Sequence, residues 1–202
     1  TAAERFAREA RATAALNSPH VVTVYDSGVA GHTAYLVMEL LPGPSLADEL
    51  VGGPRSMGAV EGVARDVLGG LAAAHDRGLV HRDIKPTNVM VSATGPVLVD
   101  FGIAMGEGES HVTRTGLVMG TPGFIAPEII DGAESDEMTD WWSVASVLAF
   151  AATGEPVFGT KPMMTVLERA AAGSANLAGL PAGTMAAFRS ALWINLGGAG
   201  LV

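Results

Sequence analysis

The chain has 202 residues and a formal net charge of −9, and 49% of its residues are hydrophobic while only 16% are charged. This composition predicts one folded domain with a substantial core and excludes a disordered chain. The sequence contains no cysteine, which excludes disulfides and thiolate metal sites, and its negative charge argues against nucleic acid as a partner.

The N-terminal part combines one helical pattern with two strand patterns. Apolar residues recur at helical spacing along residues 2–16, and Glu9 lies off this stripe as a surface carboxylate that a neighbouring arginine can pair with. The runs 21–25 and 34–38 are bounded by turn-forming residues, so we expect two strands there. The Pro-Gly-Pro run at 42–44 ends the second strand.

Two helices are expected after this turn. A short one begins at 46–50, and a longer one runs from Val60 to a point where Gly78 can close it. Gly69 and Gly70 lie inside the longer helix, where each should cost about 1 kcal/mol relative to alanine.

The most apolar stretch, 141–152, predicts a central buried helix, with Asp140 at its start as an N-cap carboxylate. The uncharged run 141–154 is too short to cross a bilayer, and glycines and a proline interrupt the apolar run 170–188. No secretory signal is visible at the N-terminus. We therefore expect a cytoplasmic protein without a membrane segment.

A hairpin is predicted where two β-type runs, 89–91 and 97–99, flank a Gly-Pro turn. An antiparallel hairpin brings the start of its first strand beside the end of its second. Asn88 and Asp100 should therefore meet at one end of the ribbon. An amide oxygen and a carboxylate at this point are ligands that Mg²⁺ accepts.

The loop that feeds this end of the hairpin carries an acid, Asp83, and a cation, Lys85. The chain reads HRDIKPTN from His81, DFG from Asp100 and GTPGFIAPE at 120–128. These ordered motifs resemble the catalytic loop, the metal-binding turn and the substrate-docking loop of the protein kinases. The Lys-Pro pair resembles the serine/threonine branch, in particular the bacterial, actinobacterial-type serine/threonine kinases.

The resemblance implies an α+β, protein-kinase-like bilobal fold. A partial N-lobe and hinge would occupy 1–41, and a mostly helical C-lobe with the catalytic loop and activation segment would occupy 42–202. The chain begins with Thr, and it has no glycine before Gly28 and no lysine before Lys85. The family's glycine-rich phosphate loop and lysine strand are absent from it, so we expect an N-terminally truncated kinase.

The resemblance also implies roles in phosphoryl transfer from ATP to serine and threonine hydroxyls of protein substrates. Asp83 would orient the hydroxyl and accept its proton, and Lys85 would balance charge on the transferred group. Asn88 and Asp100 would hold Mg²⁺, and Thr121 would buttress the loop. From the residues alone, a solvated loop aspartate and a turn-capping asparagine are the alternatives.

The ATP site that the resemblance implies includes the hinge residues Glu39 and Leu41, together with Met90 and Asp100. Met38 matches the position that gates the pocket behind the adenine. An ordinary core methionine is an equally good interpretation of Met38.

Regulatory positions follow from the same resemblance. Glu9 matches the glutamate of the regulatory helix, which pairs with a lysine that is missing here. Thr113 and Thr115 match activation-loop phosphorylation sites, and Arg82 could receive the phosphate.

Two further positions match structural residues of the family. His81 is expected to be a buried, hydrogen-bonded histidine. Asp140 matches the aspartate that holds the backbone of the catalytic loop, a role that is compatible with an N-cap.

Three hypotheses about function remain at this point. The chain could be a fragment of an active serine/threonine kinase, a catalytically inactive pseudokinase or scaffold, or a degenerate reading frame. The intact HRD, DFG and Ala-Pro-Glu motifs favour the first, and the missing phosphate loop leaves the activity of this chain in question.

Overall fold

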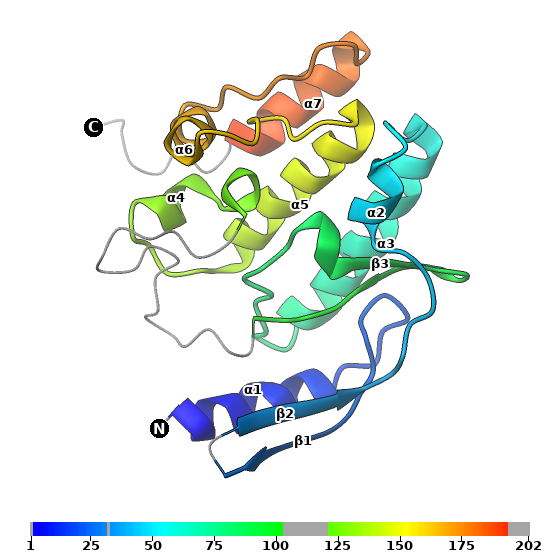
Figure 1. Ribbon diagram of the computed structural model, residues 1–202, viewed down its shortest axis with the longest axis vertical. Coiled ribbons are helices and arrows are strands. Elements are labelled where there is room, and N and C mark those ends of the chain that lie inside the picture. The colour runs from blue at the N-terminus through cyan, green and yellow to red at the C-terminus, as the bar shows by residue number, and fades with distance from the viewer. Residues whose placement is uncertain (1, 32, 103–120, 194–202) are drawn as a thin grey trace.

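The computed structural model describes residues 2–31, 33–102 and 121–193. Its helices and strands follow one another as α1 Ala2–Ala14, β1 Val24–Ala30, β2 Thr33–Met38, α2 Leu46–Leu50, α3 Met57–His75, β3 Val89–Ser92, β4 Gly95–Leu98, α4 Pro127–Ile130, α5 Glu137–Thr153, α6 Met163–Ala171 and α7 Ala182–Trp193. Figure 1 shows α1, β1 and β2 together at one end and the other helices in a larger part. The α+β fold with a partial small lobe and a mostly helical large lobe is therefore confirmed.

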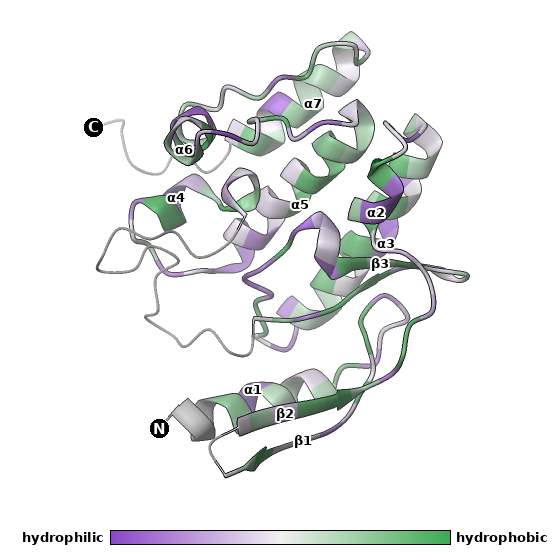
Figure 2. Cartoon of the chain, viewed as in Figure 1, coloured by the Kyte–Doolittle hydropathy of each residue, from purple (hydrophilic) through white to green (hydrophobic). Residues whose placement is uncertain are grey.

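Helix α5 is the centre of the larger part, as the sequence predicts. It is apolar on nearly all sides, and Figure 2 colours much of it as hydrophobic. Helices α3 and α7 both pack against it. Trp142 is almost fully buried and stacks on Phe158 with ring centroids 5.5 Å apart. Burial of one such large side chain stabilises the fold by about 2 kcal/mol.

The start of α5 differs from the prediction. The helix begins at Glu137, and its N-cap is Asp136, whose carboxylate accepts a hydrogen bond from the Thr139 N–H at 3.0 Å. The Thr139 hydroxyl accepts in return from the Asp136 N–H at 3.1 Å, which completes a capping box. Asp140 therefore lies within the first turn, and its assignment as the N-cap was wrong.

The predicted hairpin is confirmed. Strands β3 and β4 pair antiparallel with Val89 opposite Leu98 and Ser92 opposite Gly95. The turn itself consists of residues 93 and 94, so the prediction that Gly95 and Pro96 form it was wrong, because both residues pair with β3 as the start of β4. Gly95 has a φ of +119°, a conformation that glycine adopts at little cost directly after the turn.

The first predicted strand is shifted. Strand β1 begins only at Val24 and continues to Ala30, whereas Val21 forms a parallel bridge with Leu98. The Val22 N–H donates to the Leu98 carbonyl at 2.9 Å. The start of the predicted strand thus runs beside β4 in the larger part, which ties the two parts of the molecule together.

The small sheet has one covered and one exposed side. Strands β1 and β2 pair antiparallel, and α1 packs against β1. Tyr25, Tyr35 and Val37 are 66%, 44% and 44% exposed.

None of the described helices is long and apolar enough to cross a membrane.

Candidate active site

The catalytic loop is held by one buried carboxylate. Asp140 accepts the His81 N–H at 2.7 Å on Oδ2 and the Arg82 N–H at 2.9 Å on Oδ1. Arg82 has a φ of +69°, so two consecutive amides converge on one anion. This geometry agrees with the role that the resemblance implies for Asp140, and it fixes the backbone just before Asp83.

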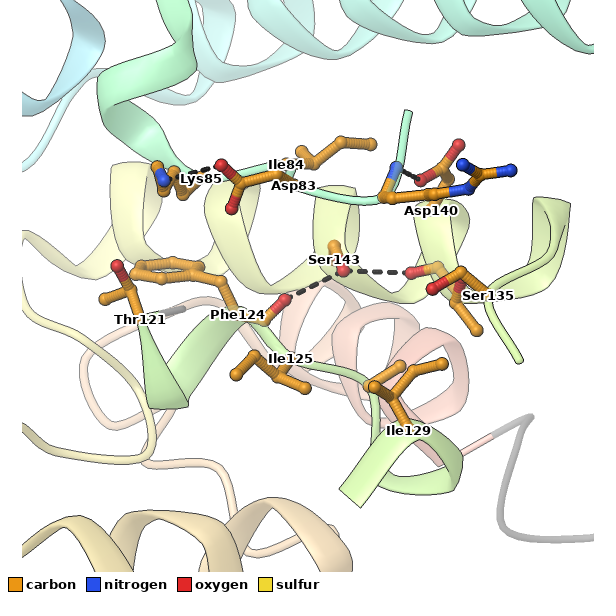
Figure 3. Close-up of a pocket in the computed structure, with 13 residues that line it drawn as sticks. Asp83, Ile84, Lys85, Thr121, Phe124, Ile125, Ile129, Ser135, Asp140 and Ser143 are labelled. Carbon is orange, nitrogen blue, oxygen red and sulfur yellow. Dashed lines mark hydrogen bonds and ion pairs between the residues drawn. The ribbon is translucent and has the colours of Figure 1, made fainter. Parts of the chain in front are cut away.

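Asp83, Lys85 and Asn88 lie together, as the sequence predicts. Lys85 Nζ is 2.6 Å from Asp83 Oδ2, and Figure 3 shows the two side chains facing one another. The Asn88 side-chain amide donates to the Asp83 carbonyl at 2.8 Å and to Asp83 Oδ2 at 3.1 Å. Both of these side-chain contacts to the Asp83 carboxylate fall on Oδ2.

The end of the hairpin carries the predicted metal ligands. The Val99 N–H donates to the Asn88 carbonyl at 3.0 Å, so Asp100 follows directly on the residue paired with Asn88. Asp100 has a φ of +55°, which is uncommon for a residue other than glycine. A cation shared by Asn88 and Asp100 stays a prediction.

A largely apolar cavity of about 340 Å³ opens beside these acids. Asp83 and Asp100 line it together with Leu36, Met38 and Phe101. Met38 therefore lines this cavity, and its role in gating an adenine pocket stays a prediction.

His81 is the buried structural histidine that the sequence predicts. It is fully buried, and its Nε2–H donates to the Val99 carbonyl at 3.0 Å. Its ring lies 4.5 Å from that of Phe101. Burial lowers the pKa of His81 despite the nearby carboxylates of Asp140 and Asp83, so the ring is neutral at pH 7.

Glu9 pairs with an arginine, as the sequence suggests, but this arginine comes from a distant part of the chain instead of a neighbouring position. Glu9 Oε1 accepts a hydrogen bond from Arg82 Nη1 at 2.9 Å, and the two side chains are only 13% and 17% exposed. A cavity of about 370 Å³ lies beside this pair, and Arg8 and Arg77 also line it. The residues of the ion pair are 73 positions apart, and no local pattern in the sequence signals their contact.

The predicted hinge residues follow β2. The Glu39 N–H donates to the Thr23 carbonyl at 2.9 Å, and its carboxylate accepts the Thr23 N–H at 2.7 Å. Leu41 is half-buried. Met90 of β3 forms an antiparallel bridge with Ser45, which lies shortly after the predicted hinge. Nucleotide contacts of Glu39, Leu41, Met90 and Asp100 stay predictions.

The remaining predicted residues belong to the segment after the DFG motif. Thr113 and Thr115 lie outside the described residues. Thr121 precedes the short 3₁₀ turn Pro122–Phe124 and lines a small cavity of about 20 Å³ together with Asp83 and Lys85. Its proposed buttressing role stays a prediction.

Sequence reasoning missed two serines of α5. Ser143 Oγ donates to the Phe124 carbonyl at 2.8 Å, and Ser146 Oγ donates to the Gly123 carbonyl at 2.7 Å (Figure 3 shows Ser143 beside Phe124). They anchor the docking loop to the core helix. Polar residues inside an otherwise apolar helix were the available signal, because a buried hydroxyl needs a partner.

Comparison with known proteins identifies the family of the chain. The model of the protein kinase domain matches residues 1–184. The chain is 44% identical over 156 residues to the serine/threonine-protein kinase PknL of Mycobacterium tuberculosis, which covers 76% of this chain and 39% of that protein. It is 39% identical over 181 residues to the serine/threonine-protein kinase AfsK of Streptomyces coelicolor, or 88% of this chain and 22% of the relative. The chain thus spans well under half of the length of these relatives.

Proposed function

The chain belongs to the protein kinase domain family, and we propose on this premise that it transfers the γ-phosphate of ATP to serine and threonine hydroxyls of protein substrates. The observation that carries the proposal is the contact of Asp83 with both Lys85 and Asn88. Phosphoryl transfer depends mainly on positioning and charge neutralisation, and this cluster supplies both. ATP as a substrate also agrees with a cytoplasmic location.

Asp83 is the group that meets the substrate hydroxyl. Lys85 and Asn88 hold its Oδ2 atom, so the carboxylate keeps one orientation and presents Oδ1 to the hydroxyl proton. Asp140 fixes the loop from the other side through two backbone amides. Lys85 supplies a positive charge close to the position of the transferred phosphoryl group.

The donor set at the hairpin end fits a magnesium ion. The Asn88 amide nitrogen is engaged by Asp83, which identifies Asn88 Oδ1 as the atom left for a cation. The Asp100 carboxylate would supply the second protein ligand, and Mg²⁺ commonly takes one or two such ligands beside phosphate oxygens. A bound Mg²⁺ would neutralise charge on the phosphates.

Regulation of this site would involve Arg82 as the receiver of a phosphate on Thr113 or Thr115. The geometry that supports this proposal is the position of Arg82 beside a cavity lined by further arginines, Arg8 and Arg77. A phosphate there would meet Glu9 as a competitor for the Arg82 guanidinium.

A second candidate is an inactive scaffold that binds partners through the larger lobe. The ion pair between Glu9 and Arg82 favours it, because it engages the arginine directly before Asp83 in a contact with α1. The intact cluster around Asp83 favours the kinase.

The test is transfer of radiolabelled phosphate from Mg-ATP to a library of peptides containing serine and threonine. Asp83→Asn should lower the rate by about 10²- to 10⁴-fold, since it removes the proton acceptor. Asp76→Asn, at an exposed aspartate just after α3, is the matched control and should leave the rate unchanged. Equal rates in both variants would favour the scaffold or a contaminating kinase.

A further inference from the structure

His75, the last residue of α3, is a buried titratable residue that the proposed reaction does not use. Its Nε2 atom lies 2.8 Å from Asp140 Oδ2, and the two side chains are only 4% and 2% exposed. Its ring packs edge-on against Trp141, with centroids 4.7 Å apart. Within the described part of the chain, its other nitrogen, Nδ1, is buried and has no hydrogen-bond partner.

These contacts select one tautomer. A carboxylate can only accept, so Nε2 carries the proton and donates to Asp140. A proton on Nδ1 would be buried without an acceptor among the described residues, which is unfavourable. The hydrogen-bond partners therefore place a proton on Nε2, which donates to Asp140.

The donated hydrogen bond acts on the catalytic loop through Asp140. Oδ2 of this carboxylate receives both the His75 Nε2–H and the His81 N–H, while Oδ1 receives the Arg82 N–H. A second donor to Oδ2 restricts rotation of the carboxylate, so that its two oxygens stay aligned with the two consecutive amides.

We propose that His75 is a positioning residue for phosphoryl transfer, which orients Asp140 and through it the backbone that leads to Asp83. The consequence for catalysis rests on the proposed kinase function. The positioning of the loop rests on the hydrogen bonds alone.

Two variants of equal polarity separate the donor from the ring. In His75→Gln the side-chain amide can occupy the place of Nε2 and donate to Asp140, whereas in His75→Asn it lies near the place of the unpartnered Nδ1. Hydrogen exchange of the His81 and Arg82 amides in the chain 1–202 should be close to wild type in His75→Gln and at least tenfold faster in His75→Asn. Equal exchange in the two variants, whether fast or slow, would overturn the proposal.

A measurement on the unaltered protein guards against variants that fail to fold. The nitrogen chemical shifts of His75 should show a protonated Nε2 and an unprotonated Nδ1, and the opposite tautomer would refute the assignment. Phosphoryl transfer is measured with the same variants joined to a glycine-rich, lysine-bearing N-terminal segment. It should show kcat about tenfold lower in His75→Asn, unchanged KM for ATP, and recovery in His75→Gln. Faster exchange with an unchanged kcat would exclude a positioning role. Absence of transfer in all three proteins would count against the kinase function. In that case, amide exchange still decides whether His75 orders the loop.

Discussion

Glu9 on α1 and Arg82 in the catalytic loop form an ion pair of 2.9 Å that joins the small part of the molecule to the catalytic centre. The pair is largely shielded from solvent, so its hydrogen bond is stronger than that of an exposed surface pair. It links Glu9 to a residue 73 positions away in the chain.

Breaking this pair should destabilise the fold. Glu9→Gln removes the charge and should lower the free energy of unfolding by about 1 to 2 kcal/mol, because a charged hydrogen bond between poorly exposed groups is lost. Urea denaturation followed by circular dichroism measures the change. Glu61→Gln, at an exposed position of α3, is the control and should stay within about 0.5 kcal/mol of wild type. A similar small effect in both variants would show that the pair contributes little.

The chain 1–202 should transfer phosphate poorly. No lysine precedes Lys85, Glu9 is engaged by Arg82, and no glycine-rich segment precedes Gly28 to place backbone amides around the phosphates. Positioning can contribute several kcal/mol, and each 1.36 kcal/mol is about tenfold in rate, so a deficit of several orders of magnitude is expected. The comparison is radiolabel transfer by 1–202 and by the same chain joined to a glycine-rich, lysine-bearing N-terminal segment. Comparable turnover would refute this reasoning.

The extended protein should phosphorylate itself on Thr113 and Thr115. Arg82 lies beside two other arginines of one cavity and offers the charge that a phosphothreonine needs. Mass spectrometry after incubation with Mg-ATP should detect both phosphates, and Asp83→Asn should abolish them while Asp76→Asn does not. Equal labelling in Asp83→Asn would identify another kinase as the source.

Stability should fall in mild acid because of His81. Burial holds its pKa below the ordinary value of about 6.5, so the unfolded chain binds a proton that the folded chain does not. The stability that comes from keeping His81 neutral is fully present above pH 6.5. As the pH falls below this value, the free energy of unfolding decreases by up to about 1.4 kcal/mol per pH unit. Urea denaturation between pH 7.5 and 5.5 should show this slope in His20→Gln and a flatter one in His81→Gln. An identical slope in both variants would assign the effect to other groups.

The neighbouring glycines of α3 should respond oppositely to alanine. At Gly69 a Cβ atom would come no closer than 3.9 Å to its nearest neighbour, a side-chain carbon of His20, so Gly69→Ala should stabilise the helix by about 0.5 to 1 kcal/mol. At Gly70 a Cβ atom would lie 2.8 Å from the His20 carbonyl oxygen, so Gly70→Ala should destabilise the fold by about 1 to 3 kcal/mol. Thermal unfolding of the two variants checks the signs. A gain in both would mean that the His20 segment moves away without cost.

The sequence by itself determined the features that depend on neighbouring residues. The hairpin of β3 and β4 follows from two β-type runs separated by a few turn-forming residues, and the apolar run of α5 identifies the core helix, because strand, turn and helix patterns repeat over a few residues. The motif residues Asp83, Lys85 and Asn88 meet for the same reason, since they lie on one short loop.

Only the tertiary structure decided which distant groups meet. Asp140 reaches the amide of Arg82 across 58 positions, and Glu9 reaches its guanidinium across 73. Val21 pairs with β4 instead of extending β1 for a related reason, because a backbone hydrogen bond can be made with any strand that packing brings alongside. The packing of helices and sheets determines which distant residues make contact. A local sequence pattern does not specify these contacts.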